Sequence, residues 1–151
     1  MTRSTGSNTI LLADDDEDDR LNTQHAFSKH RLADELRFAV DGEDLMNYLR
    51  RRGQYQNAPR PALILLDLNM PRKDGREALK EIKEDPELKN IPVVVLTTSG
   101  EDEDILRTYN LGANSFIRKP VEFEALVKIV DTIGQYWFHV VELPPVSKGR
   151  N

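Results

Sequence analysis

The sequence predicts an α/β fold in which a five-stranded parallel sheet carries helices on both faces. Short continuous apolar runs alternate with segments of helical periodicity through most of the chain, as in parallel sheets whose strands are buried on both faces. Asp-Gly, Asp-Pro and single glycine turn signals separate these segments. Polar residues follow three of the apolar runs, and such sheets bind ligands at the carboxyl ends of their strands. The pattern therefore indicates a functional site at one rim of the sheet.

The first two strand–helix units follow from apolar runs and helix-terminus signals. Residues 9–14 (TILLAD) form an expected strand, and the acidic residues after it cap an expected helix at 17–29 and complement its dipole. Residues 36–40 (LRFAV) form the second strand. An Asp-Gly turn then leads into a helix at 43–52, which ends in three arginines, where cations complement the helix dipole.

The remaining three units are built in the same way. Their strands are the short runs at 63–67, 93–97 and 115–118, and their helices are expected at 76–84, 102–111 and 123–138. Asp74-Gly75 precedes the first of these helices, and Gly112 follows the second at a position typical of a left-handed helix cap. In the last helix, consecutive residues point about 100° apart, so Tyr136 and the two aromatic residues after it cannot all enter one core.

One domain at residues 9–138 accounts for these units, between a flexible N-terminus at 1–8 and a C-terminal extension at 139–151. A chain of this length can bury roughly 70% of its unfolded surface and needs no disulfide. The chain contains no cysteine, which excludes thiolate chemistry and predicts a reducing compartment, the cytoplasm. Its formal charge of −5 argues against nucleic-acid binding, and its apolar runs are far shorter than the roughly 20 residues that span a membrane.

Three carboxylates are expected to meet at the rim of the sheet. Asp14 and Asp15 follow the first strand, and Asp67 ends the third. Crowded carboxylates repel one another unless a cation shares them, and ligands that are all oxygen suggest Mg2+ or Mn2+. For residues 16–19 we expect instead a solvated acidic run that caps the first helix.

Asp67 is the candidate nucleophile. A carboxylate beside a magnesium ion can attack phosphorus to give an acyl phosphate. The negative charge on the phosphoryl oxygens then needs a mobile cation, which Lys119 is placed to supply, and Thr97 is placed to donate a hydroxyl hydrogen bond. Taken singly, a Lys-Pro pair and a threonine at a strand end are ordinary structural features, so the joint placement carries the argument.

Together these motifs resemble the receiver domain of response regulators, over residues 9 to 138. They are Asp14-Asp15, Leu66-Asp67-Leu68-Asn69-Met70-Pro71, Asp74-Gly75, Leu96-Thr97-Thr98 and Arg118-Lys119-Pro120. The resemblance implies the flavodoxin-like strand order 2-1-3-4-5. It implies that Asp67 accepts a phosphoryl group from a phosphohistidine on a sensor histidine kinase. It also implies that Asp15 ligates Mg2+ directly, that Asp14 assists through water, and that the Asn69 backbone carbonyl is a further ligand.

The resemblance extends to a switch. Thr97 would move toward the phosphoryl group, and Phe116 would rotate inward behind it, which would reshape the surface of the fourth helix, the fifth strand and the fifth helix. For Phe116 alone, an ordinary core role is an equal alternative. Thr98 stands where the family usually has alanine, and its bulk is expected to alter the access to the site and the lifetime of the phosphoryl group.

The ending Tyr136-Trp137-Phe138-His139-Val140-Val141-Glu142-Leu143-Pro144-Pro145 and the stretch 53–61 resemble the single-domain regulators paired with cyanobacterial phytochrome kinases. This implies a phytochrome-type kinase as phosphodonor, a homodimer formed through Tyr136, Trp137 and Phe138, and an unidentified downstream protein. Equally, residues 140–145 would cover these aromatics within one subunit. Two other functions are open: a receiver-like scaffold that is never phosphorylated, and an aspartyl phosphatase, which Asn69 disfavours because it cannot protonate a leaving group.

Overall fold

Five parallel strands form a single sheet in the order β2-β1-β3-β4-β5, which confirms the predicted fold. The computed structural model describes residues 9–29, 35–98, 102–140 and 142–144. The strands are β1 (Thr9–Ala13), β2 (Glu35–Ala39), β3 (Leu63–Leu66), β4 (Val93–Thr97) and β5 (Ser115–Arg118). Because β1 and β3 are neighbours in the sheet, the residues that follow these two strands emerge side by side at one rim.

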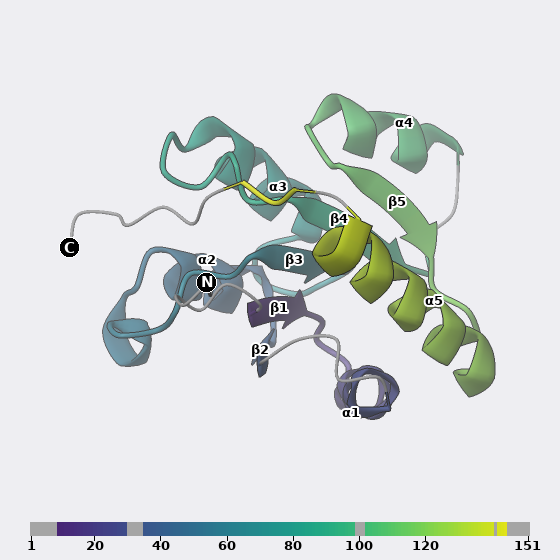
Figure 1. Ribbon diagram of the computed structural model, residues 1–151. Helices are drawn as coiled ribbons and strands as arrows, with labels where there is room; N and C mark the ends of the chain where they lie inside the picture. Colours follow the sequence, from purple (N-terminus) through teal and green to yellow (C-terminus); the bar gives the residue numbers. More distant parts are fainter. Residues whose placement is uncertain (1–8, 30–34, 99–101, 141, 145–151) are drawn as a thin grey trace.

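The helices cover both faces of this sheet (Figure 1). They are α1 (Glu17–Ser28), α2 (Gly42–Leu49), α3 (Gly75–Glu84), α4 (Asp102–Asn110) and α5 (Phe123–Gln135). Alternate strand residues point to opposite faces, so Ile10 and Leu12 pack with α1 and α5, whereas Leu11 and Ala13 pack with α2 and α3. No helix in the described part of the chain is long and apolar enough to cross a membrane.

Two helix ends differ from the sequence prediction. The helix expected at 43–52 ends at Leu49, because Arg51 takes the left-handed backbone conformation (φ 55°) and a 3-10 turn, η1 (Gly53–Tyr55), follows. The helix expected at 123–138 is regular only to Gln135, after which a π-helical turn, η2 (Tyr136–Val140), continues it. The other element bounds agree with the prediction to within about one residue at each end.

The loop between β3 and α3 lies tightly against the residue that ends β3. The Gly75 backbone N–H donates to the carbonyl of Leu68 at 2.9 Å. A side chain at Gly75 would place its Cβ only 2.4 Å from the carbonyl oxygen of Asp67. This position therefore requires glycine, because the backbone of Gly75 approaches the backbone of Asp67 closely. The contact also restricts the movement of the Asp67 backbone.

A partly buried ion pair joins α3 to α4. The Arg76 guanidinium donates from Nε and Nη2 to the two carboxylate oxygens of Asp104, at 2.9 and 2.7 Å. Arg76 also contacts Asp74, the residue that caps α3. These hydrogen bonds raise the pKa of Arg76, chiefly through Asp104. Planar two-point pairing of this kind fixes geometry as well as charge, so the pair links the first turn of α3 to the first turn of α4.

We expect Gly75→Ala to lower the free energy of unfolding by about 1–3 kcal/mol, because the added methyl group overpacks the backbone of Asp67. Urea denaturation followed by the fluorescence of Trp137, the single tryptophan, measures the change. An unaltered urea midpoint would contradict the close approach.

For the α3–α4 ion pair, a double-mutant cycle of Arg76→Ala and Asp104→Ala should give a coupling energy of about 1 kcal/mol, read from urea midpoints. The cycle cancels the separate contact of Arg76 with Asp74. The exposed pair Arg37–Glu35 on β2, at 2.7 Å, is the matched control and should couple more weakly because solvent screens it. Equal coupling in the two cycles would show that burial gives the Arg76 pair no advantage.

Candidate functional site

Two buried carboxylates are held at the rim by backbone hydrogen bonds that extend the sheet beyond the strands. The Asp14 N–H donates to the carbonyl of Ala39 and the Asp67 N–H donates to the carbonyl of Ala13, each at 3.0 Å. Only 1% of Asp14 and 8% of Asp67 is exposed. The carboxylates of Asp14 and Asp67 therefore lie where water alone cannot solvate their charges.

Asp15 completes the predicted carboxylate cluster. Asp14, Asp15 and Asp67 each offer a carboxylate oxygen, and these oxygens lie within 4.8 Å of one another. Burial raises the pKa of Asp14, and the hydrogen bond from Lys119 partly offsets that effect. An oxygen-only set of this size fits a hard divalent cation such as Mg2+ or Mn2+. Asn69 follows in the same loop, where its N–H donates to Oδ1 of Asp67 at 3.2 Å.

Lys119 brings an ammonium group into contact with this cluster. Its Nζ lies 2.7 Å from Asp14 Oδ2, 3.1 Å from Asp19 Oδ2 and 3.5 Å from Asp67 Oδ2, and its side chain is 7% exposed. Burial alone would lower the pKa of Lys119, but the surrounding carboxylates, Asp14 and Asp67 foremost, raise it above the ordinary value. The ammonium group therefore stays charged.

Asp19 is a site residue that the sequence analysis missed. We expected residues 16–19 to be a solvated cap, which is correct for Asp16, whose carboxylate accepts from the N–H groups of Asp18 and Asp19. It is wrong for Asp19, because the first turn of α1 directs its carboxylate to Lys119. The sequence did contain one signal for this role, which is the position of Asp19. It lies three residues after the cap, in the first turn of the helix that follows β1.

Thr97 and Phe116, the predicted switch pair, lie on neighbouring strands. Thr97 is fully buried, and its hydroxyl donates to Oδ1 of Asp67 at 2.8 Å. Phe116 is partly buried against the core on the α2 and α3 side, and its N–H donates to the hydroxyl of Tyr109 at 3.2 Å. Thr98, the next residue along the chain, is exposed. Phe116 therefore packs as a core aromatic, a position that is compatible with the predicted switch.

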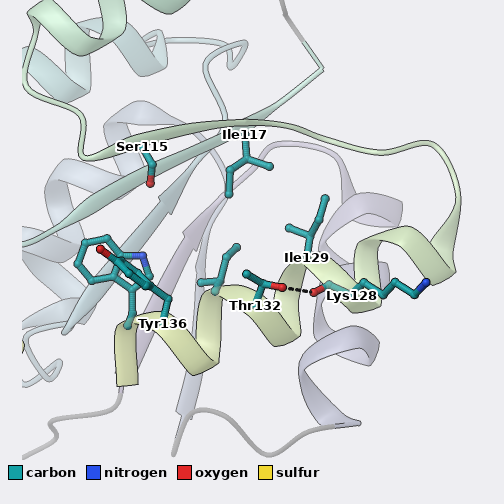
Figure 2. Close-up of a pocket in the computed structure, with 8 residues that line it drawn as sticks. Ser115, Ile117, Lys128, Ile129, Thr132 and Tyr136 are labelled. Carbon is teal, nitrogen blue, oxygen red and sulfur yellow. Dashed lines mark hydrogen bonds between the residues drawn. The ribbon is translucent and has the colours of Figure 1, made fainter. Parts of the chain in front are cut away.

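Two of the three predicted interface aromatics, Tyr136 and Trp137, line a groove away from the rim. A cavity of about 280 Å3 lies between β5 and α5, where Ser115 and Ile117 project toward Thr132 and Tyr136 (Figure 2). Tyr136 is 50% exposed, whereas Trp137 and Phe138 are partly buried against the core. Tyr136 and Trp137 meet edge to face, with ring centroids 5.3 Å apart. Of the alternative cover at 140–145, residues 141 and 145 lie outside the described residues.

Comparison with known proteins agrees with this geometry. Residues 10–131 match the response regulator receiver domain family. The chain is 44% identical over 135 residues to response regulator Rcp1 of Synechocystis sp. (strain ATCC 27184 / PCC 6803 / Kazusa), covering 89% of this chain and 92% of that protein.

Two solved structures share the fold throughout. The phosphorylated cyanobacterial phytochrome response regulator RcpA superposes with a TM-score of 0.86 at 45% identity, covering 91% of this chain and 98% of that one. The Mn2+-bound form of response regulator Rcp1 gives 0.85 at 44% identity, with 91% and 99% covered. The chain therefore belongs to the response regulator receiver family, a family of signalling proteins, and is related to the phytochrome response regulators.

Proposed function

We propose that a phytochrome-type sensor histidine kinase phosphorylates this protein on Asp67 and that the phosphoryl group alters its contacts with other proteins. The observation that carries the proposal is the convergence of charge and hydrogen-bond donors on one buried carboxylate. Thr97 donates to Asp67, and the ammonium of Lys119 lies 3.5 Å from it. The kinase class is supported by the likeness to RcpA and Rcp1.

The chemistry follows from these groups. A carboxylate oxygen of Asp67 attacks the phosphorus of a phosphohistidine, the P–N bond breaks, and the imidazole of the kinase leaves with the electron pair. The hydroxyl of Thr97 and the ammonium of Lys119 are positioned to bind the phosphoryl oxygens, where negative charge gathers. Asn69 offers no general acid, so we expect slow self-dephosphorylation and no turnover of other phosphate esters.

The proposed metal site consists of the side chains of Asp14, Asp15 and Asp67 and the backbone carbonyl of Asn69. The carboxylate cluster supports a divalent ion, which we assign as Mg2+ or Mn2+. When bound, the ion would supply positive charge that neutralises the crowded carboxylates and the phosphoryl oxygens.

Incubation with Mg2+ and acetyl phosphate should add one phosphoryl mass to the protein, measured by intact mass spectrometry. Asp67→Asn should take up none, because an amide is not a competent nucleophile, and a chelator should prevent the reaction. Asp18→Asn is the matched control, since Asp18 is an exposed carboxylate on the first turn of α1, and it should still react.

The outcomes separate the competing functions. No adduct on the wild type would favour a scaffold that is not phosphorylated, and label on Asp67→Asn would mean that another residue is the nucleophile. Sustained release of phosphate from an ester such as p-nitrophenyl phosphate would favour a phosphatase. A phytochrome-type histidine kinase labelled with ATP should transfer its label to the wild type, and transfer only from other kinase classes would refute the phytochrome assignment.

We further propose that the protein forms a homodimer through the groove between β5 and α5, with Tyr136 as the principal contact and Trp137 and Phe138 supporting it. The support is the exposed aromatic ring beside an apolar groove, a composition typical of interface cores. The cytoplasm remains the expected compartment, since the chain lacks cysteine.

Tyr136→Glu should weaken self-association by about tenfold or more, because it replaces an aromatic anchor with a charge at the interface. Sedimentation velocity over a concentration series, with and without acetyl phosphate, measures the dimer. Val121→Glu makes a similar apolar-to-acidic change at a fully exposed residue away from the groove and should leave association unchanged. Equal effects of the two variants, or a monomeric wild type under both conditions, would refute this dimer.

A further inference from the structure

Asp19 differs from the other carboxylates that contact Lys119. In the described part of the chain, three carboxylates lie within 3.5 Å of the ammonium, and Asp14 and Asp67 belong also to the carboxylate cluster. Asp19 lies outside that cluster, and among the described residues its carboxylate forms an ion pair with Lys119 only. A cation that binds the cluster would therefore leave Asp19 free to keep its contact with Lys119.

The beginning of α1 fixes Asp19 in this place. Oδ1 of Asp16 accepts from the N–H groups of Asp18 and Asp19, at 2.9 and 3.2 Å, and so sets the first turn of the helix. Nη1 of Arg20 donates to the carbonyl of Asp14 at 2.8 Å and joins the same turn to the end of β1. The contact of Asp19 with Lys119 is thus built by the local fold, although the Asp19 side chain is partly exposed.

We propose that Asp19 is a positioning residue that holds the ammonium of Lys119 toward α1. This inference rests on the proposed function. The carboxylate of Asp19 adds negative charge that attracts a divalent cation. It also balances the charge of Lys119 when that cation engages Asp14. The same carboxylate competes with the phosphoryl oxygens for the ammonium and repels an anionic phosphodonor. Asp19 therefore strengthens metal binding and slows phosphorylation.

Removal of the Asp19 charge should therefore weaken the binding of Mg2+ and speed phosphorylation, so one variant tests both effects. Asp19→Asn should raise the dissociation constant for Mg2+ by roughly two- to fivefold, as expected for a partly solvated charge. At saturating Mg2+, the same variant should react with acetyl phosphate roughly two- to fivefold faster than the wild type. Isothermal titration with Mg2+ measures the first quantity, and the rate at which phosphoryl mass appears measures the second.

Asp18→Asn is the matched control, because it removes the same charge from the same turn of α1. Its carboxylate forms no ion pair within the part of the chain that the structure describes, so both changes should be clearly smaller than those of Asp19→Asn. The comparison separates the contact with Lys119 from the general loss of one negative charge.

Each result decides the inference. If Asp19→Asn binds Mg2+ more weakly and also reacts more slowly, the substitution has damaged the structure of the site. That result would overturn the positioning role. Equal effects in Asp19→Asn and Asp18→Asn would overturn it as well. If the wild type takes up no phosphoryl group, the proposed function fails, and the two Mg2+ affinities, which require no phosphotransfer, still decide whether Asp19 acts on the cation site.

Discussion

The ion pairs of Lys119 are the interaction on which the site depends. Asp14 is almost completely buried, and a buried carboxylate without a partner costs several kcal/mol. The ammonium of Lys119 provides the partner at 2.7 Å and reaches Asp67 as well. It therefore ties the ends of β1 and β3 to the end of β5, at the outer edge of the sheet. A charge that the fold needs for stability is then also one that the chemistry can use.

Strand order explains why residues so distant in sequence meet. Because β1, β3 and β4 are neighbours, the ends of these strands bring Asp14, Asp67 and Thr97 together. The backbone around them is equally constrained, since Gly75 packs against the carbonyl of Asp67. These backbone contacts fix where the side chains leave the sheet before a ligand binds, which contributes to the preorganisation that electrostatic stabilisation requires.

The sequence predicted the strands and the rim because those depend on a strong signal, apolar runs that end in polar residues. It did not predict the contact of Asp19 with Lys119 or the pair of Arg76 with Asp104. Four acidic residues in succession at 16–19 look alike in the sequence, and only the starting point of α1 decides which of them faces the rim. The Arg76 pair depends on the position of α4 relative to α3, and the residue pattern of neither helix predicts that position.

The strand β5 links the rim to the groove. Ser115 and Ile117 line the cavity beside α5, whereas Phe116, which points to the opposite face, packs on the side of α2 and α3. Lys119 follows directly after the strand, and its N–H donates to the carbonyl of Thr97 at 2.8 Å. A rearrangement of Thr97 and Lys119 around a phosphoryl group would thus act on the same short strand that forms one wall of the groove. The predicted switch would therefore need no long path, because Lys119 directly follows the strand that forms one wall of the groove.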